Sequence, residues 1–126
     1  MGIAASIRKT VILTHGDSDG ICSAAIALAA IPHAEVRITR PPLLVKELKR
    51  VKGENLVILD LSINDHIKNE VLTELRRIAG EGSRILYIDH HPLPPGVKRE
   101  DIPGRYINTC DEHTCTSENV YKYFKH

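Results

Sequence analysis

Three short polar groups along the chain carry the side chains best suited to chemistry. They are His15, Asp17 and Asp19 in the first group, Asp60 in the second, and Asp89, His90 and His91 in the third. Carboxylates that lie close together repel one another strongly unless a counter-charge is present. Divalent cations supply that counter-charge, and a mixture of carboxylate and imidazole suits manganese-like ions. If the three groups meet in the folded chain, these residue types predict a metal site.

The spacing within the first group favours a pair of ions. Asp17 and Asp19 are two residues apart on a predicted turn, so each can face a different ion, and Asp60 could bridge both. Two ions about 3.5–4 Å apart can hold a shared hydroxide and clamp a phosphoryl group for in-line displacement. This chemistry predicts a metal-dependent site for displacement at a phosphoryl group.

Each group also has a purely structural interpretation. Asp17 and Asp19 are typical of turns and helix N-termini, and Asp60 alone is an ordinary polar residue at a strand end. Two adjacent histidines after a buried strand and an acid are less common, and the three groups together favour the metal site. The other histidines lack such neighbours and are interpreted as surface or loop residues. These are His33, His66, His113 and His126.

Apolar runs alternate with helical patterns along the chain. The predicted strands are residues 10–14, 36–38, 56–59 and 85–88, with a short extra strand at 105–107. Predicted helices cover 21–31, 44–51, a segment reaching Ile78 behind a capping box of Ser62 and Asp65, and 117–124. This alternation predicts an α/β fold, doubly wound, with a mostly parallel sheet of about five strands and helices on both faces.

The polar groups have a defined place in this predicted sheet. The strands at 10–14, 56–59 and 85–88 each run directly into one of the three groups. In a parallel sheet, ligands bind beyond the carboxyl ends of the strands. The three groups are therefore expected to converge at one edge of the sheet.

Length, charge and composition restrict the classes of function. The 126 residues suffice for one domain, which we expect to span residues 1–126. A formal net charge of +1 argues against a protein held to long nucleic acid by phosphate contacts. A local basic stretch is interpreted as a solvated helix face, and it comprises Arg37, Arg40, Lys46, Lys49, Arg50 and Lys52. No Gly-Lys-Ser/Thr phosphate loop is present.

The cysteines and the absence of targeting signals predict a reducing cytoplasm. Cys22, Cys110 and Cys115 form an odd set, nothing before Thr10 resembles a signal peptide, and no apolar run approaches a membrane span. Cys110, His113 and Cys115 do not match a common structural zinc spacing. We interpret them as ordinary loop residues.

The three groups resemble the motifs of the DHH phosphoesterase superfamily. The motif His-x-Asp-x-Asp-Gly matches residues 15–20, an acid ending a strand matches Asp60, and the name-giving motif matches residues 89–91. His15 lies two residues before Asp17, as in the exonuclease-like branch. The resemblance covers residues 10–124 and implies a metal-dependent hydrolase of phosphodiester or phosphoanhydride bonds that uses two manganese or magnesium ions. It also implies phosphate-containing substrates such as oligonucleotides, cyclic dinucleotides, polyphosphate or pyrophosphate.

The resemblance also implies a role for each residue. Asp17 would ligate one ion and Asp19 the other, while Asp60 would bridge them. His90 would be a further ligand, as would His15 in the exonuclease-like branch. His91 would face the substrate phosphate, and Asp89 would orient the histidines.

Members of this superfamily carry a fourth motif with another aspartate ligand and a smaller C-terminal domain. Because neither occurs within residues 1–126, we expect an incomplete catalytic domain that is weak or inactive by itself. Two alternatives stay open. The chain could be a non-catalytic metal- or nucleotide-binding regulatory module, or a haloacid-dehalogenase-like phosphatase with Asp17 as nucleophile and Asp19 as general acid. The second alternative leaves residues 89–91 without a role.

Overall fold

A five-stranded sheet forms the centre of the protein. The computed structural model describes residues 8–109 and 114–125. The strands are β1 (Thr10–His15), β2 (Glu35–Thr39), β3 (Asn55–Leu59), β4 (Ile85–Asp89) and β5 (Arg105–Asn108). They lie in the order β2-β1-β3-β4-β5, and every neighbouring pair is parallel. The predicted α/β fold is thus confirmed, and the sheet is entirely parallel.

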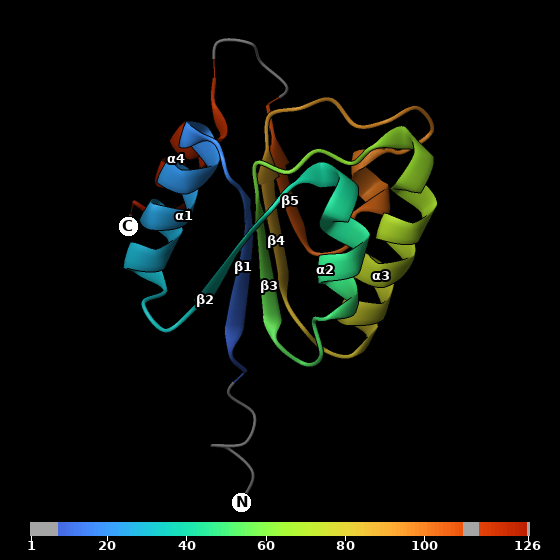
Figure 1. The fold of residues 1–126 in the computed structure, drawn as a ribbon, viewed down its shortest axis with the longest axis horizontal. Coiled ribbons are helices and arrows are strands. Elements are labelled where there is room, and N and C mark those ends of the chain that lie inside the picture. The colour runs from blue at the N-terminus through green and yellow to red at the C-terminus, as the bar shows by residue number, and fades with distance from the viewer. Residues whose placement is uncertain (1–7, 110–113, 126) are drawn as a thin grey trace, which may run out of the picture.

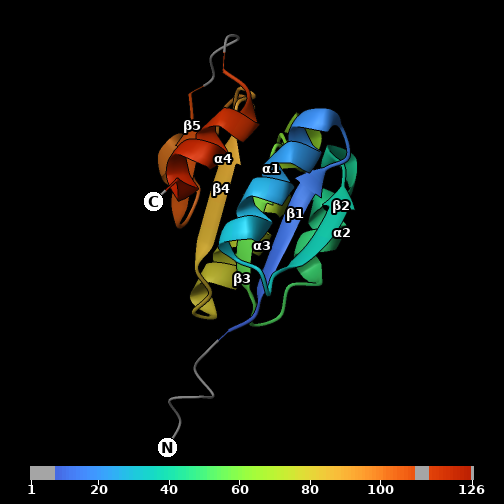
Figure 2. The same cartoon turned by 90° about the vertical axis from the view of Figure 1, so that its left-hand side faces the viewer.

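Helices cover both faces of the sheet, as Figures 1 and 2 show. Helices α1 (Ser18–Ala30) and α4 (Thr116–Phe124) lie on one face, and α2 (Leu44–Lys49) and α3 (Lys68–Gly80) lie on the other. Successive strand residues point to opposite faces, so Ile12 and Val57 pack under α1 and α4 while Val11 and Leu13 pack under α2 and α3. Burial on both faces explains why β1, β3 and β4 are apolar without alternation.

The strand order places a topological switch point between β1 and β3. From β1 the chain passes through α1 to β2 on one side, and from β2 it passes through α2 to β3 on the other side of β1. The two connections lie on opposite faces, so they diverge at the carboxyl ends of β1 and β3. Doubly wound sheets bind ligands at such a switch point. The residues that follow β1 and β3 therefore occupy a favoured position for a site.

The start of α3 differs from the sequence prediction. A short 3₁₀ turn, Asp65–Ile67, precedes the helix, and neither the turn nor α3 has a side-chain cap. The predicted capping box of Ser62 and Asp65 is therefore wrong. Asp65 forms an ion pair with Lys68 at 2.8 Å instead, so its carboxylate is directed toward a side chain in the first turn of α3.

Residues 90–104 connect β4 to β5 without an α-helix. A single 3₁₀ turn, Arg99–Asp101, interrupts this proline-containing segment. Ile102 is buried in the core between the sheet and the helices α2 and α3, and Leu93 and Val97 pack against the same core. The connection therefore covers the sheet on the face of α3.

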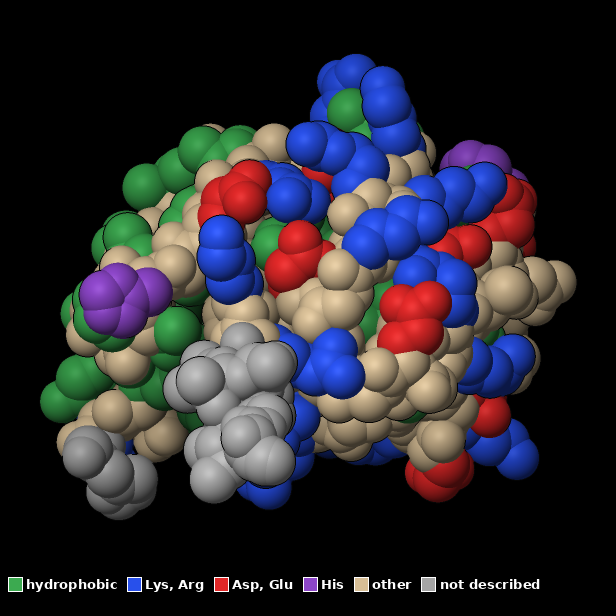
Figure 3. Space-filling model, turned by 90° about the horizontal axis from the view of Figure 1, so that it is seen from below, with side chains coloured by type: hydrophobic (Ala, Val, Ile, Leu, Met, Phe, Trp, Pro, Cys, Tyr) green, Lys and Arg blue, Asp and Glu red, His purple; other side chains and the backbone are tan. Residues whose placement is uncertain are grey.

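The face at the amino ends of the strands carries Lys and Arg interspersed with Asp and Glu (Figure 3). Within the basic stretch, Arg37 pairs with Glu35 at 2.8 Å and Arg50 with Glu47 at 3.2 Å. The exposed members Lys46 and Lys49 lie on α2. This pattern matches a solvated face. In the described part of the chain, no helix is both long and apolar enough to cross a membrane.

Candidate metal centre

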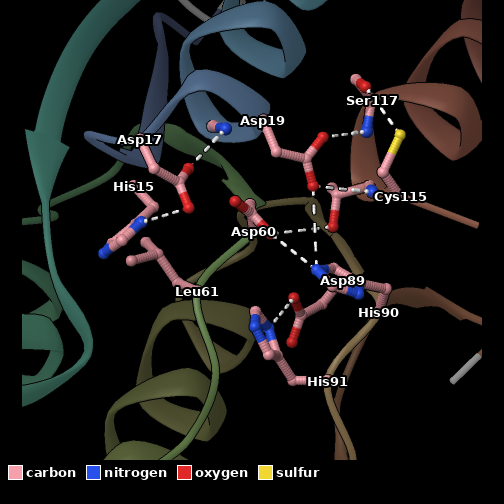
Figure 4. Close-up of polar contacts among 12 residues, drawn as sticks. His15, Asp17, Asp19, Asp60, Leu61, Asp89, His90, His91, Cys115 and Ser117 are labelled. Atoms are coloured by element: carbon pink, nitrogen blue, oxygen red, sulfur yellow. Dashed lines mark hydrogen bonds and ion pairs between the residues drawn. The ribbon is translucent and has the colours of Figure 1, made fainter. Parts of the chain in front are cut away.

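Side chains from four segments meet at the carboxyl ends of β1, β3 and β4. Figure 4 shows Asp17 and Asp19 from the start of α1, Asp60 after β3, and His90 after β4 turned toward one another, with the start of α4 beside them. His90 Nε2 lies 3.4 Å from Asp60 Oδ1 and 3.7 Å from Asp19 Oδ2. The convergence expected from the strand ends is therefore present in the structure.

The tight passage from β1 into α1 positions the first group. Asp17 is the N-cap of α1, and its Oδ1 accepts a hydrogen bond from Gly20 N at 2.9 Å. Thr14 Oγ1 donates to the carbonyl of Gly20 at 2.7 Å and ties the helix to the strand. A Cβ atom at Gly20 would lie 2.1 Å from the carbonyl oxygen of His15. Only glycine therefore permits this approach.

Asp60 has an unusual backbone conformation. Its φ is +59°, and among residues 8–109 and 114–125 it is the one non-glycine residue with a positive φ. Such a conformation costs an L-residue about 1–2 kcal/mol, and aspartate tolerates it better than most. The amide of Asp60 donates to the carbonyl of Ile88 at 3.0 Å, and the residue is only 2% exposed. Strain at a buried carboxylate is typical of functional sites.

Two sets of potential metal ligands share the carboxylate of Asp60. One consists of His15, Asp17 and Asp60, and the other of Asp60, His90 and His91, with one ligand atom from each residue lying within 4.8 Å of the others in its set. In the first set, His15 Nδ1 also lies 3.1 Å from Asp17 Oδ2. Three carboxylate or imidazole donors at such separations suit a divalent cation. The donor chemistry thus fits an ion on each side of Asp60.

Asp19 is bound to the N-terminus of α4. Its Oδ1 accepts from Ser117 N at 2.9 Å and its Oδ2 from Thr116 N at 3.0 Å. Thr116 also donates its hydroxyl to Asp60 Oδ1 at 3.0 Å. Sequence analysis did not identify Thr116, because 56 residues separate it from Asp60 and 97 from Asp19, and no local pattern marks it.

The two histidines of the third group differ in their partners. His91 Nδ1 lies 2.8 Å from Asp89 Oδ1, and Asp89 is 2% exposed. This contact leaves Nε2 of His91 as the nitrogen available to a ligand or substrate. The ring of His90 lies beside that of His91 with centroids 4.3 Å apart, and Nε2 of His90 is the atom that approaches Asp19 and Asp60.

The surroundings of the carboxylates shift their pKa values in opposite directions. Burial, and then the charge of Asp19, raise the pKa of Asp60 to about 7. Burial would also raise the pKa values of Asp17 and Asp19, but hydrogen bonds outweigh it and hold both below the ordinary range. For Asp17 the main hydrogen bond comes from the Gly20 amide, and for Asp19 from the Ser117 amide. The hydrogen bond to Asp89 raises the pKa of His91. Of the three aspartates Asp17, Asp19 and Asp60, Asp60 therefore binds a proton most readily.

The remaining candidates lie outside this cluster. His33 and His66 are exposed, as expected. Cys22 is exposed on α1, and Cys115 directly precedes α4, where its Sγ lies 3.1 Å from Ser117 Oγ. Cys110, His113 and His126 fall outside the described residues, so the structure does not test the interpretation of these three positions.

The arrangement of these motifs agrees with a comparison against protein families. The model of the DHH family, N-terminal domain, matches residues 9–126. The chain belongs to the DHH family. Among curated proteins, no sequence matches this DHH domain.

Solved structures share the fold of this DHH domain. RecJ from Thermus thermophilus, crystallised in complex with Mn²⁺, superposes with a TM-score of 0.62 at 17% identity, over 90% of this chain and 17% of RecJ. An uncharacterized protein from Helicobacter pylori superposes with a TM-score of 0.67 at 16% identity, over 94% of this chain and 37% of that chain. The DHH domain described here thus spans less than half of either relative.

Proposed function

We propose that this DHH domain carries the metal site of a protein that hydrolyses phosphodiester or phosphoanhydride bonds with the help of two divalent cations. The observation that carries the proposal is the position of Asp60, whose buried carboxylate belongs to both sets of potential ligands. This carboxylate would contribute to an ion on each side, and a pair of ions would supply the charge needed for in-line displacement at phosphorus. Membership of the DHH family, a family of phosphoesterases, supports the same class of reaction.

Each ion would have its own donors. His15 and Asp17 would hold one ion together with Asp60, and His90 would hold the other with Asp60. Asp19 lies 3.7 Å from His90 Nε2 and would complete the set on that side. Mn²⁺ is the ion we expect, with Mg²⁺ as the alternative, because imidazole donors favour the softer ion. The Mn²⁺ in the RecJ structure supports this choice.

When bound, such cations polarise the phosphoryl oxygens and supply a nucleophile at neutral pH. The chain itself would bind and orient the substrate. With Nδ1 held by Asp89, His91 would direct Nε2 at a phosphate oxygen of the substrate. Because Asp89 raises the pKa of His91, the imidazole carries more positive charge near neutral pH and favours an anionic group.

Compounds that contain a phosphodiester or phosphoanhydride bond are the proposed substrate class. Oligonucleotides, cyclic dinucleotides, polyphosphate and pyrophosphate all present the phosphoryl group that two ions would clamp. The net charge of +1 gives little general attraction for a long polyanion. Recognition would then depend on the few atoms around the reacting phosphorus.

The test measures Mn²⁺-dependent hydrolysis of bis(p-nitrophenyl) phosphate and of pyrophosphate by the full-length protein, together with calorimetric Mn²⁺ binding. We expect Asp60→Ala to abolish turnover and also to abolish Mn²⁺ binding at the site of higher affinity. Asp65→Ala is the matched control, since Asp65 is an exposed aspartate that contacts Lys68 instead of the cluster. Full activity of Asp60→Ala would exclude the proposed role of the site. Mn²⁺ binding without turnover of either compound would favour the non-catalytic regulatory module.

A further inference from the structure

We infer that Thr116 is a positioning residue that ties helix α4 to two carboxylates of the candidate metal centre. This inference rests on the proposed function, because the positions of these carboxylates matter only if the carboxylates bind ions. Thr116 contacts both of them directly, through its amide to Asp19 at 3.0 Å and through its hydroxyl to Asp60 at 3.0 Å. Nothing in the three sequence motifs includes this residue.

The amides at the start of α4 fix the orientation of Asp19. The amides of Thr116 and Ser117 each donate to a different oxygen of the Asp19 carboxylate. Rotation of this carboxylate about its Cβ–Cγ bond would break both contacts. The first amides of a helix have no partner within the helix, and they carry partial positive charge that favours a carboxylate. Each oxygen still has a lone pair for another partner. The contact therefore orients Asp19 without blocking its use as a ligand.

The hydroxyl of Thr116 donates a hydrogen bond to Asp60, a buried residue with a positive φ. Asp60 is 2% exposed and has a φ of +59°, and it lies 3.4 Å from His90 Nε2. The Thr116 hydroxyl donates to Oδ1 of Asp60, the same oxygen that His90 Nε2 approaches. This bond therefore directs Oδ1 toward the side where His90 lies.

Helix α4 is well suited to hold this position. Thr116 is fully buried, and Val120 one turn later is buried with Ala24 and Ala27 of α1 in the core. Because α1 also carries Asp19, the two helices that pack together present the donor and the acceptor of the same contact. Helix α4 therefore contacts the candidate metal centre through Thr116.

Groups that orient metal ligands affect affinity without touching the ion. Loss of such a partner weakens metal binding or activity by about 10- to 100-fold. The variant Thr116→Val keeps the shape and the amide but removes the hydroxyl, so we expect its Mn²⁺ affinity to fall within that range. Thr116→Ser keeps the hydroxyl and should bind Mn²⁺ nearly as the wild type does.

Calorimetric titration of Mn²⁺ into the wild type and these variants tests the inference, with thermal unfolding as a measure of folding. Thr39→Val is the matched control, because Thr39 is also buried but its hydroxyl has no partner among the described residues. Loss of affinity in Thr116→Val, restored in Thr116→Ser at a similar melting temperature, supports the role of the hydroxyl.

Two results overturn the inference. One is wild-type affinity in Thr116→Val, and the other is an equal loss in Thr116→Val and Thr116→Ser, which would assign the effect to packing. Absence of Mn²⁺ binding by the wild type would instead overturn the proposed function, and Asp60→Ala provides the reference for a lost site. The two failures are therefore distinguishable.

Discussion

Gly20 lies so close to the carbonyl group of His15 that a Cβ atom at this position would be 2.1 Å from its oxygen. The neighbouring atoms are backbone and cannot rotate away. This approach brings the first turn of α1 against the carboxyl end of β1, and the flanking residues Asp17 and Asp19 reach the cluster from that turn. The geometry of the site thus depends on a residue without a side chain.

The variant Gly20→Ala should therefore destabilise the protein. Alanine is the better helix former by about 1 kcal/mol, but the clash costs more, and overpacking of this kind costs about 1–3 kcal/mol. We expect a lower free energy of unfolding in urea and weaker Mn²⁺ binding. Gly80→Ala is the control, because a Cβ at Gly80 on α3 meets nothing within 4 Å. It should leave stability unchanged or slightly increased, and a similar loss in both variants would contradict the argument.

Asp60 should make the metal-free protein less stable as the pH rises. Its pKa in the folded protein is about 7, against 3.8 as the ordinary value, so between these values the folded state binds more protons than the unfolded state. The contribution of Asp60 to the free energy of unfolding is therefore fully present below about pH 4 and is lost as the pH rises to about 7. Each unit of difference between the folded and unfolded pKa values corresponds to about 1.4 kcal/mol. The raised pKa of His91 acts in the same direction.

Urea unfolding in the presence of EDTA at several pH values measures this decline. Asp60→Asn removes the ionisable group and should flatten the profile between about pH 4 and 7. Asp65→Asn replaces an exposed aspartate and should keep the wild-type slope. A profile for Asp60→Asn that declines as steeply as that of the wild type would exclude a raised pKa for Asp60.

Asp89→Asn should lower the pKa of His91. The hydrogen bond between Asp89 Oδ1 and His91 Nδ1, at 2.8 Å, is the main reason for the raised value, and the amide of asparagine carries no charge to stabilise the imidazolium. The measurement is the pH dependence of the His91 ring resonance by NMR, assigned with His91→Gln. An unchanged midpoint in Asp89→Asn would show that the carboxylate does not control this histidine.

Tyr87→Phe should destabilise the segment that follows Asp60. The Tyr87 hydroxyl donates to the carbonyl of Leu61, and Tyr87 is 1% exposed. Phenylalanine keeps the edge-to-face contact with Tyr106 but leaves a buried carbonyl without this donor, which costs about 1–3 kcal/mol. Tyr121→Phe, at a residue 59% exposed, should change the free energy of unfolding by less than about 0.5 kcal/mol. Equal effects would contradict the assigned role.

Much of the fold could be predicted because its signals are local. The four predicted strands and the short extra one matched the five observed strands to within one residue at either end. The chain between them was long enough for crossover connections, which makes the sheet parallel. The predicted start of α3 was wrong. Ser62 and Asp65 have the spacing of a capping box, but neither the 3₁₀ turn nor α3 has a side-chain cap. Short capping motifs are weak when a side chain such as Lys68 offers a competing partner.

The sequence by itself determined which polar groups follow which strands, and hence that Asp17, Asp60 and His90 end at one edge of a parallel sheet. Hydrophobic patterning fixes this, because β1, β3 and β4 each bury both faces. Only the tertiary structure decided the left-handed backbone of Asp60, the approach of Gly20 to His15, and the contacts of Thr116 with two carboxylates. Packing of α4 on α1 and of β3 beside β4 produces the contacts of Thr116 and Asp60, between residues too distant in sequence for any local pattern to record.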